Sequence, residues 1–371
     1  MTMPDGPGGP GGDAARAADV ADAGDGGVRA ADADVRIPLP CPLDLRMTLG
    51  LHQRGAGDPA MRFEVSGSCW RATRTPEGLG TELLEIVRPF EADADAAGGG
   101  SGAGAGIPGA GAGILGAGVP GELRVRAWGP GAAWLVATAP ALVGLDDAPE
   151  RLVPAHPVVA EAARRMRGLR IGRTGAVAEA LIPAILEQKI TGEEARHVYR
   201  GIIRRWGEDA PGGFGLRVLP APAVLAAVPY HELHPIGLER RRSELLAAVC
   251  HEAPRLERMG VAAAGPSADP EARARFYAAL RSFRGIGPWT AAEVGMRALG
   301  DPDAVSVGDF HIPSIVSWAL AGEPRGTDER LLELLAPYAG QRGRVVRLLE
   351  RTGVEPPKRG PRMSTRRIGH L

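Results

Sequence analysis

The sequence predicts an α+β protein in which an N-terminal antiparallel sheet domain is followed by an all-helical domain. Two observations carry this prediction. Short, partly alternating apolar runs separated by Gly and Pro fill residues 35–90 and resume over 122–140, a pattern typical of strands. From about His156 onward, apolar residues recur at helical spacing instead. The 371 residues, of which 44% are hydrophobic, are enough for two or three domains with sizeable cores.

Changes in composition place the domain boundaries. Residues 1–34 are dominated by Gly, Ala, Asp and Pro and contain no aromatic residue, so we expect a disordered acidic tail. Residues 35–150 form the predicted sheet domain, and a low-complexity Gly/Ala-rich insert at 91–121 is expected to be a flexible loop within it. Residues 151–355 form the helical domain, and 356–371 form a basic tail.

The helical domain shows clear starts and stops. Residues 176–207 predict two helices with a break near Thr191 and Gly192. Pro288 is expected in the first turn of a later helix, where its missing N–H costs nothing. Four residues of the two helices are predicted to be buried: Leu181, Ile185, Ile202 and Ile203.

The net charge of zero hides a division along the chain. Residues 1–150 carry 11 basic and 20 acidic residues, whereas residues 151–371 carry 33 basic and 24 acidic. The C-terminal part therefore favours a polyanion such as nucleic acid. The alternative is that these basic residues only solvate helix faces. Lys189 and Lys358 are the only lysines, so arginine supplies nearly all of the positive charge.

The remaining composition excludes several classes of protein. Cys41, Cys69 and Cys250 are scattered, which fits neither a disulfide framework nor a four-cysteine cluster. No apolar run approaches the roughly 20 residues of a membrane span, and the N-terminus does not resemble a signal peptide. We therefore expect no membrane association and a reducing, cytoplasmic compartment.

The most informative stretch is "FRGIGPWTAAEVGMRALGDPDAVSVGDFHIP", residues 283–313. Gly285 and Gly287 permit a tight hairpin between two helices and close approach of another backbone, and Ile286 between them is expected to plug the hairpin into the core. The helix after the glycines offers free N–H groups, which suit a phosphate. An ordinary helix–helix turn is the alternative for this part alone.

Asp309 lies just before the apolar segment "FHIPSIVSWAL". It is therefore expected to be an N-cap or first-turn acid of the following helix, whose N-terminus stabilises the anion. Most aspartates in such places are plain caps. A functional role requires that the carboxylate be held beside a cleft.

Together these two elements resemble the helix-hairpin-helix DNA glycosylases, and among them the 3-methyladenine DNA glycosylase II group. The resemblance covers roughly residues 36–355, without the Gly/Ala-rich insert. It implies that Asp309 is the catalytic carboxylate. The residues that match the motif are Phe283, Gly285, Ile286, Gly287, Thr290 and Ala291, followed by Asp309.

One position bears on the reaction. Members of the family that also cut the DNA backbone carry a lysine two residues after the second hairpin glycine, and its amine attacks the sugar. In this chain Trp289 occupies that position. The resemblance therefore implies a monofunctional enzyme that hydrolyses the N-glycosidic bond of flipped-out alkylated purines and leaves an abasic site.

The resemblance also implies further site residues. DNA contacts are expected from the hairpin, from Gln188, and from Lys189 or Ile190 as the wedge that fills the gap left by the flipped base. No cofactor is expected to be required, although backbone carbonyls of Phe283 and Ile286 are candidates to hold a structural Na⁺ or K⁺. The expected DNA contacts are Gln188, Lys189, Ile190, Gly285, Gly287, Trp289 and Thr290, and the expected base pocket comprises Trp289, Glu293, Trp318 and Tyr230.

Three other hypotheses remain open from the sequence. The enzyme could act on deaminated or oxidised bases, the chain could be a non-catalytic protein that recognises damaged DNA, or the glycines could only form a turn in a helical scaffold. The expected partner in the leading hypothesis is double-stranded DNA with damaged bases. A monomer associated with the nucleoid is expected.

Overall fold

The computed structural model describes residues 29–92 and 118–357. The chain divides into two units, Met1–Ala31 and Asp32–Leu371, and all the elements below belong to the second. Most of the predicted acidic tail, the centre of the predicted insert and nearly all of the predicted basic tail lie outside the described residues.

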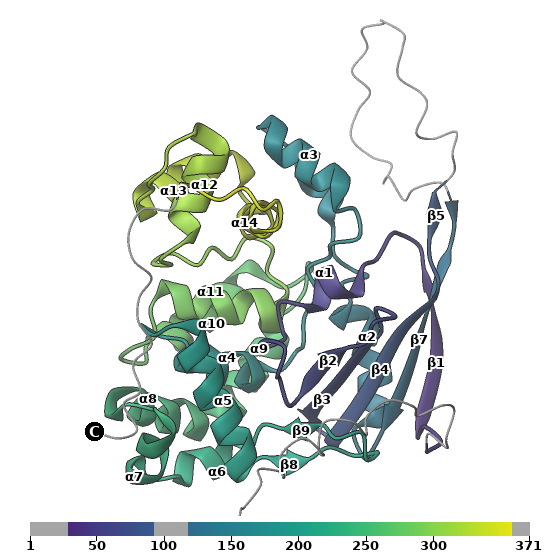
Figure 1. Ribbon diagram of the computed structural model, residues 1–371, viewed down its shortest axis with the longest axis vertical. Helices are drawn as coiled ribbons and strands as arrows, with labels where there is room; N and C mark the ends of the chain where they lie inside the picture. Colours follow the sequence, from purple (N-terminus) through teal and green to yellow (C-terminus); the bar gives the residue numbers. More distant parts are fainter. Residues whose placement is uncertain (1–28, 93–117, 358–371) are drawn as a thin grey trace, which may run out of the picture. The chain divides into compact units, whose positions relative to one another are not determined.

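The sheet is antiparallel and five-stranded, with the order β1-β7-β4-β3-β2 (Figure 1). Exposed and less exposed residues alternate along β1, as the sequence pattern predicted. The prediction of an N-terminal antiparallel sheet followed by a helical region is therefore confirmed. The strands are β1 (Ala33–Leu39), β2 (Met61–Phe63), β3 (Cys69–Thr75), β4 (Gly78–Arg88) and β7 (Gly121–Trp128).

Two further pairs of strands flank this sheet. β5 (Glu91–Ala92) pairs with β6 (Gly118–Val119), so both ends of the predicted insert belong to an ordered two-stranded ribbon. β8 (Glu208–Asp209) pairs with β9 (Arg217–Val218) inside the helical region.

The strand prediction for residues 122–140 is wrong in its second half, because α2 (Ala132–Leu142) is a helix. Gly129, with φ 93°, ends the strand. The apolar run after it shows no alternation, and Leu135, Ala139 and Leu142 are buried on one side of the helix. A short run that is apolar throughout does not separate a buried helix from a strand by periodicity.

The predicted helix break near Thr191 is confirmed. Thr191 caps α5 and forms a reciprocal pair of hydrogen bonds with Glu194, which satisfies N–H groups at the start of the helix. The helices are α1 (Leu45–Leu49), α3 (Pro157–Arg165), α4 (Val177–Leu186), α5 (Gly192–Trp206), α6 (Pro222–Ala227), α7 (Tyr230–Leu233), α8 (Arg240–His251), α9 (Ala253–Ala263), α10 (Pro270–Arg281), α11 (Pro288–Val294), the π-helix η4 (Gly295–Leu299), α12 (Ile312–Ala321), α13 (Asp328–Leu335) and α14 (Arg342–Arg351). Short 3₁₀ turns lie at η2 (Pro149–Arg151), η3 (His234–Ile236) and η5 (Ala336–Tyr338).

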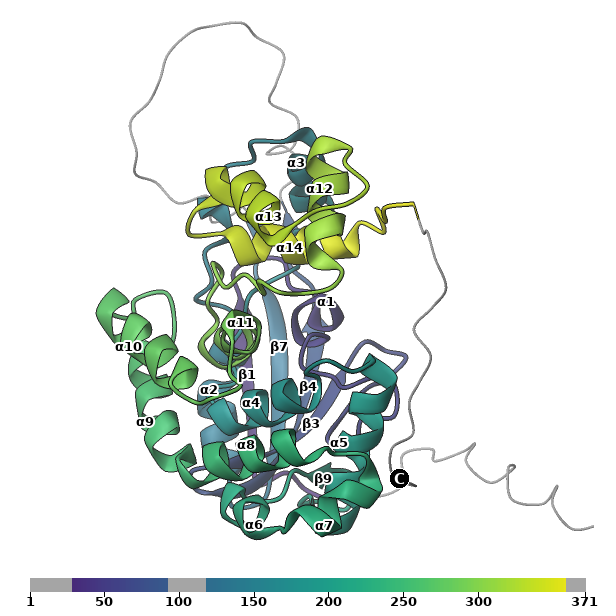
Figure 2. The same cartoon turned by 90° about the vertical axis from the view of Figure 1, so that its left-hand side faces the viewer.

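The helices pack around two separate cores. The first helical cluster gathers residues of α4, α5, α8, α9, α10 and α11, among them Leu181, Ile185, Ile202, Ile203 and Phe276. The second helical cluster gathers residues of α3, α12, α13 and α14, among them Val159, Val316, Leu331, Leu335 and Val345. Both views show α3, α12, α13 and α14 together and apart from α4, α8 and α9 (Figures 1 and 2). The chain passes from the first cluster to the second between η4 and α12.

A buried ionic cluster joins the sheet to the helices. Arg71 on β3 forms ion pairs of 2.6 Å with Glu82 on β4 and 3.0 Å with Glu179 on α4. Glu82 is fully buried, and desolvation raises the pKa of its carboxyl although Arg71 opposes this. The cluster therefore depends on a single guanidinium.

Replacing Arg71 by Met should destabilise the protein by about 3–5 kcal/mol, because Glu82 is left buried without a partner. The double variant Arg71→Met/Glu82→Leu should recover most of that loss, because it removes both buried charges. Urea unfolding followed by circular dichroism measures both. A double variant as unstable as the single one would contradict this account of the cluster.

Candidate functional site

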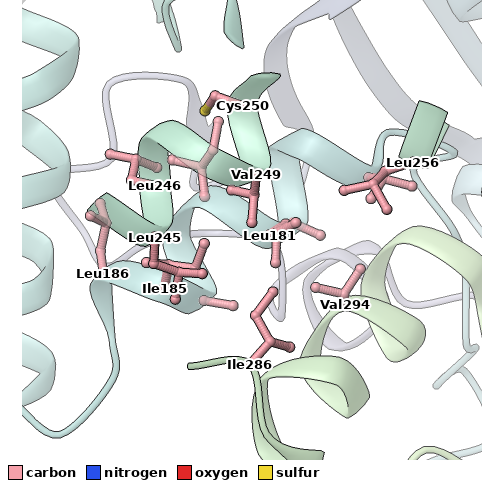
Figure 3. Packing of buried hydrophobic residues seen from close by; sticks show 14 of the residues in the cluster. Leu181, Ile185, Leu186, Leu245, Leu246, Val249, Cys250, Leu256, Ile286 and Val294 are labelled. Carbon is pink, nitrogen blue, oxygen red and sulfur yellow. The ribbon is translucent and has the colours of Figure 1, made fainter. Parts of the chain in front are cut away.

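The hairpin between α10 and α11 requires a glycine at position 285. Gly285 has φ 114°, and a Cβ there would lie 3.1 Å from the Leu245 Cδ2 atom. The Ile286 N–H donates to the Phe283 carbonyl at 3.0 Å, which closes the turn. The buried side chain of Ile286 points toward Ile185 and its neighbours in the first helical cluster, as expected (Figure 3). The hairpin is thus fixed to the core by its own tip.

The second glycine serves another purpose. Gly287 has φ −98°, which any residue can adopt, and a Cβ at this position would meet no atom within 4 Å. Pro288 begins α11 at the next residue. The first N–H groups of a helix lack intrahelical partners, and the open space over Gly287 gives an anion access to them.

Gln188 ties a second loop to this hairpin. Its Nε2 atom donates to the Gly285 carbonyl at 3.1 Å and to the Thr290 hydroxyl oxygen at 2.9 Å. The next residue, Lys189, has φ 57° and is exposed. Within residues 29–92 and 118–357 it is the one non-glycine residue with positive φ. Ile190 is partly buried.

Asp309 lies where the chain enters the second helical cluster. Its Oδ1 atom accepts hydrogen bonds from the backbone N–H groups of His311 at 2.7 Å and Ile312 at 3.0 Å, at the start of α12. Its Oδ2 atom accepts a hydrogen bond from the indole Nε1–H of Trp289 at 3.0 Å. The N-cap of α12 is His311, so the expectation that Asp309 is itself the N-cap or a first-turn residue is wrong. Asp309 precedes the N-cap by two residues and still accepts hydrogen bonds from the first N–H groups of the helix, and Trp289 on α11 supplies a third donor.

The part of the chain that the structure describes supplies neutral donors but no cationic partner to Asp309. Among the described residues, no ion pair engages this carboxylate. Phe310, the next residue, is 89% exposed, and its ring lies 4.9 Å from the ring of His311, centroid to centroid. Sequence reasoning passed over Phe310, although its position directly after the candidate catalytic acid was a usable signal. Arg284, exposed beside Gly285, was also passed over.

Glu293 lies inside the protein. The carboxylate forms an ion pair with Arg297 and accepts a hydrogen bond from the Ser306 hydroxyl at 2.5 Å. Burial alone would raise the pKa of Glu293, but Arg297, Arg347 and Ser306 outweigh it and lower the pKa to about 2. Arg297 in turn donates to the Leu51 carbonyl at 3.0 Å, which connects the helix to the sheet domain. The base-pocket role of Glu293 stays a prediction.

The other two predicted pocket residues are differently placed. Trp318 is partly exposed on α12, in the same helix that begins beside Asp309. Tyr230 shares a hydrogen bond of 2.9 Å with His234, and the Arg240 guanidinium lies over its ring at 4.6 Å. Both views place α7, which carries Tyr230, at the opposite end from α12 (Figures 1 and 2). The structure therefore groups Gln188 and the hairpin with Asp309, and leaves Tyr230 outside that group.

No metal site is evident in the part of the chain that the structure describes, where no three His, Cys, Asp or Glu side chains gather to hold an ion. The Phe283 carbonyl accepts one hydrogen bond, which leaves its second lone pair for another partner. The hairpin carbonyls are therefore chemically able to bind a monovalent cation. Such a cation remains a proposal.

A cavity of about 830 Å³ lies elsewhere, between β3 and the helices α4, α6 and α9. Its lining includes Arg71, Thr73, Glu179 and Glu257 but none of the predicted site residues. The size of this cavity says nothing about chemistry at Asp309.

Comparison with known proteins agrees with the fold. No protein-family model matches the chain. It is 30% identical over 175 residues to a "Probable bifunctional transcriptional activator/DNA repair enzyme AlkA" of Mycobacterium tuberculosis, covering 46% of this chain. The chain spans about a third (33%) of the length of the curated relatives it matches. A 3-methyladenine DNA glycosylase from Archaeoglobus fulgidus has the same fold, with a TM-score of 0.63, 19% identity, and coverage of 85% of this chain and 97% of that one.

The chain therefore shares its fold with a solved DNA glycosylase. This fold alone does not determine the substrate. An 8-oxoguanine glycosylase/lyase from Clostridium acetobutylicum is similar to this chain with a TM-score of 0.56 and 11% identity, covering 85% of this chain and 95% of its own. Among the described helices, none is long and apolar enough to cross a membrane.

Glu293→Gln should destabilise this glycosylase-fold protein by about 3–5 kcal/mol at neutral pH, because Arg297 loses its buried partner. The folded-state pKa of about 2 lies below the unfolded value of 4.5, so the ionised carboxylate contributes stability above pH 4.5. That contribution is lost as the pH falls toward 2. Urea unfolding of both proteins across this range should show the difference shrinking.

The matched control is Glu271→Gln, which removes an exposed ion pair with Arg275. It should change stability by less than about 0.5 kcal/mol. A Glu293→Gln effect as small as this control would show that the buried pair is not needed.

Proposed function

We propose that this protein is a monofunctional DNA glycosylase that removes alkylated purines of the 3-methyladenine type from double-stranded DNA and leaves an abasic site. The observation that carries the proposal is the placement of Asp309. Its carboxylate is oriented by three N–H donors, is not neutralised by a cation among the described residues, and is joined through Trp289 to the hairpin.

The hairpin supplies the grip on DNA. A phosphate can approach Gly287 closely and accept hydrogen bonds from the first-turn N–H groups of α11. Arg284, exposed beside it, adds a positive charge. Such a grip positions the backbone without reading sequence, which suits an enzyme that inspects bases one at a time and flips the damaged one into a pocket.

Asp309 performs the chemistry in this proposal. The bond between C1′ and the base nitrogen breaks, its electron pair goes to the cationic alkylated base, and the base leaves neutral. The sugar then carries positive charge, which the Asp309 carboxylate stabilises at close range. Water adds to C1′ and loses a proton to Asp309 or to solvent. Because the leaving base is already cationic, no strong general acid is needed. The exposed ring of Phe310 beside Asp309 is suited to stacking on the flipped base.

The absence of a backbone-cutting step follows from Trp289. Strand cleavage through a Schiff base needs an amine at this position. The indole N–H of Trp289 is instead a hydrogen-bond donor to Asp309. We therefore propose that the product is an intact strand with an abasic site.

Lys189 is the better candidate for the wedge. A left-handed backbone costs a non-glycine residue free energy and persists where the surroundings enforce it, often at functional sites. Gln188 fixes this loop to the hairpin, and Lys189 extends from it into solvent, whereas Ile190 is partly buried. The four-carbon stem of Lys189 can fill the space of the flipped nucleotide.

The remaining parts of the proposal follow from this role. The partner is double-stranded DNA with damaged bases, and the protein acts as a monomer in the cytoplasm, at the nucleoid. No cofactor is required. A Na⁺ or K⁺ ion held by carbonyls of Phe283 and Ile286 would brace the hairpin against the phosphate.

Asp309→Asn should reduce release of 3-methyladenine from a defined duplex by about 100-fold to 1000-fold, because a neutral amide does not stabilise the cationic sugar. Single-turnover assays that quantify free base measure this. Affinity for abasic duplex should stay within about threefold, because the hairpin is unchanged. Retained base release in this variant would rule out Asp309 as the catalytic group.

Lys189→Met and Lys189→Ala separate the wedge from a phosphate contact. If the stem fills the gap, Met should retain most of the single-turnover rate while Ala loses about tenfold. A phosphate contact would instead weaken binding equally in both variants and reduce the salt dependence of affinity by about one ion. That second pattern would contradict the wedge.

A further inference from the structure

The hydrogen bond between Trp289 and Asp309 connects the first helical cluster to the second. Trp289 lies in the first turn of α11 and packs against the first helical cluster. Asp309 lies at the start of α12, whose residues belong to the second helical cluster. The 3.0 Å contact between the indole Nε1 and the Oδ2 atom therefore spans the junction at which the chain passes from one cluster to the other.

The hydrogen bond from Trp289 also restrains the orientation of the Asp309 carboxylate. The two backbone N–H groups at the start of α12 both bond to Oδ1, so by themselves they hold one oxygen atom. The indole N–H holds the other oxygen, and rotation about the Cβ–Cγ bond is then restrained at both ends. Neutral donors achieve this without the charge cancellation that a Lys or Arg partner would bring.

We propose that Trp289 is a positioning residue for catalysis, whose indole N–H orients Asp309 and holds the second helical cluster in register with the hairpin. This inference rests on the proposed glycosylase function and names a part of the same site. It assigns to Trp289 a polar role, which is distinct from stacking on a flipped base.

The residue next to Trp289 also connects the hairpin to the loop that carries Lys189. Thr290, the next residue, accepts the side-chain hydrogen bond of Gln188, and Lys189 follows Gln188 directly. Two consecutive residues of α11, Trp289 and Thr290, thus follow the hairpin directly and bond to the proposed catalytic carboxylate and to the loop that carries Lys189.

The test compares two single replacements that differ in the N–H. Trp289→Phe keeps an aromatic ring and removes the donor, whereas Trp289→His keeps a ring N–H. Single-turnover base release from a 3-methyladenine duplex should fall by about 10-fold to 100-fold in Trp289→Phe, the range for losing a hydrogen bond to a charged group. Affinity for abasic duplex should stay within about threefold. Trp289→His should recover at least part of the lost rate.

The matched control is Trp206→Phe on α5, which should stay within about threefold of the wild type. A Trp289→Phe rate within threefold of wild type, with melting temperature unchanged, would overturn the inference, because a ring alone would then suffice. Equal losses in Trp289→Phe and Trp289→His, both folded, would overturn it as well. If Trp289→Phe does not fold, the comparison of Trp289→His with the wild type decides: a rate lower by more than about 100-fold with intact folding contradicts the role of the N–H.

A double replacement separates this inference from the proposed function. In the Asp309→Asn background, Trp289→Phe should reduce residual base release no further, because the group it positions is gone. An additional loss of tenfold would show that Trp289 acts through the base instead. Absence of base release from the wild-type protein, by contrast, would reject the proposed function itself.

Discussion

The arrangement of the site depends on one hydrogen bond, from the Trp289 indole to Asp309, because it joins the two helical clusters at the point of chemistry. Each cluster has its own core. The two also approach each other where Gly343 on α14 lies against Met296 on η4 and where Arg347 helps to lower the pKa of Glu293. The α12 N-terminus stabilises the anion, and Trp289 places it against the hairpin. A catalytic group held in this way needs no rearrangement of its donors when positive charge develops on the sugar.

The helix that carries Trp289 is itself held at both ends. Ile286, just before the helix, is buried in the first helical cluster, and Glu293 near its end pairs with Arg297, which reaches the Leu51 carbonyl. A buried ion pair is costly to break and adds little stability over an apolar pair. In this position the pair links α11 to η4 and, through Arg297, to Leu51 before the sheet strand β2. Precise placement of a site depends on such supporting contacts.

Sequence reasoning predicted those features whose causes are local. The helix break near Thr191, the proline at the start of α11 and the spacing from Gly285 to Asp309 are all readable from neighbouring residues. Features that depend on distant partners were not predicted. The helix α2 resembles a strand until the sheet beneath it is known. Lys189 has a left-handed backbone, and the residue before it, Gln188, bonds to a hairpin about a hundred residues away. The sequence could have suggested the ion pair of Glu293 with Arg297, because the two residues are four positions apart on one helix. The hydrogen bond from Ser306 to Glu293 could not be predicted, because it forms only in the folded protein.

The central claim is that Asp309 presents to a cationic sugar an oriented negative charge that is not paired with any cation among the described residues. Duplexes that contain a pyrrolidine abasic analogue, which is positively charged at neutral pH, test this directly against duplexes with a neutral tetrahydrofuran analogue. Because an enzyme binds the mimic of its transition state more tightly than a neutral analogue of the same shape, the account predicts that the wild-type protein binds the cationic duplex at least about 100-fold more tightly at matched salt. Equal affinity for the two duplexes would contradict it.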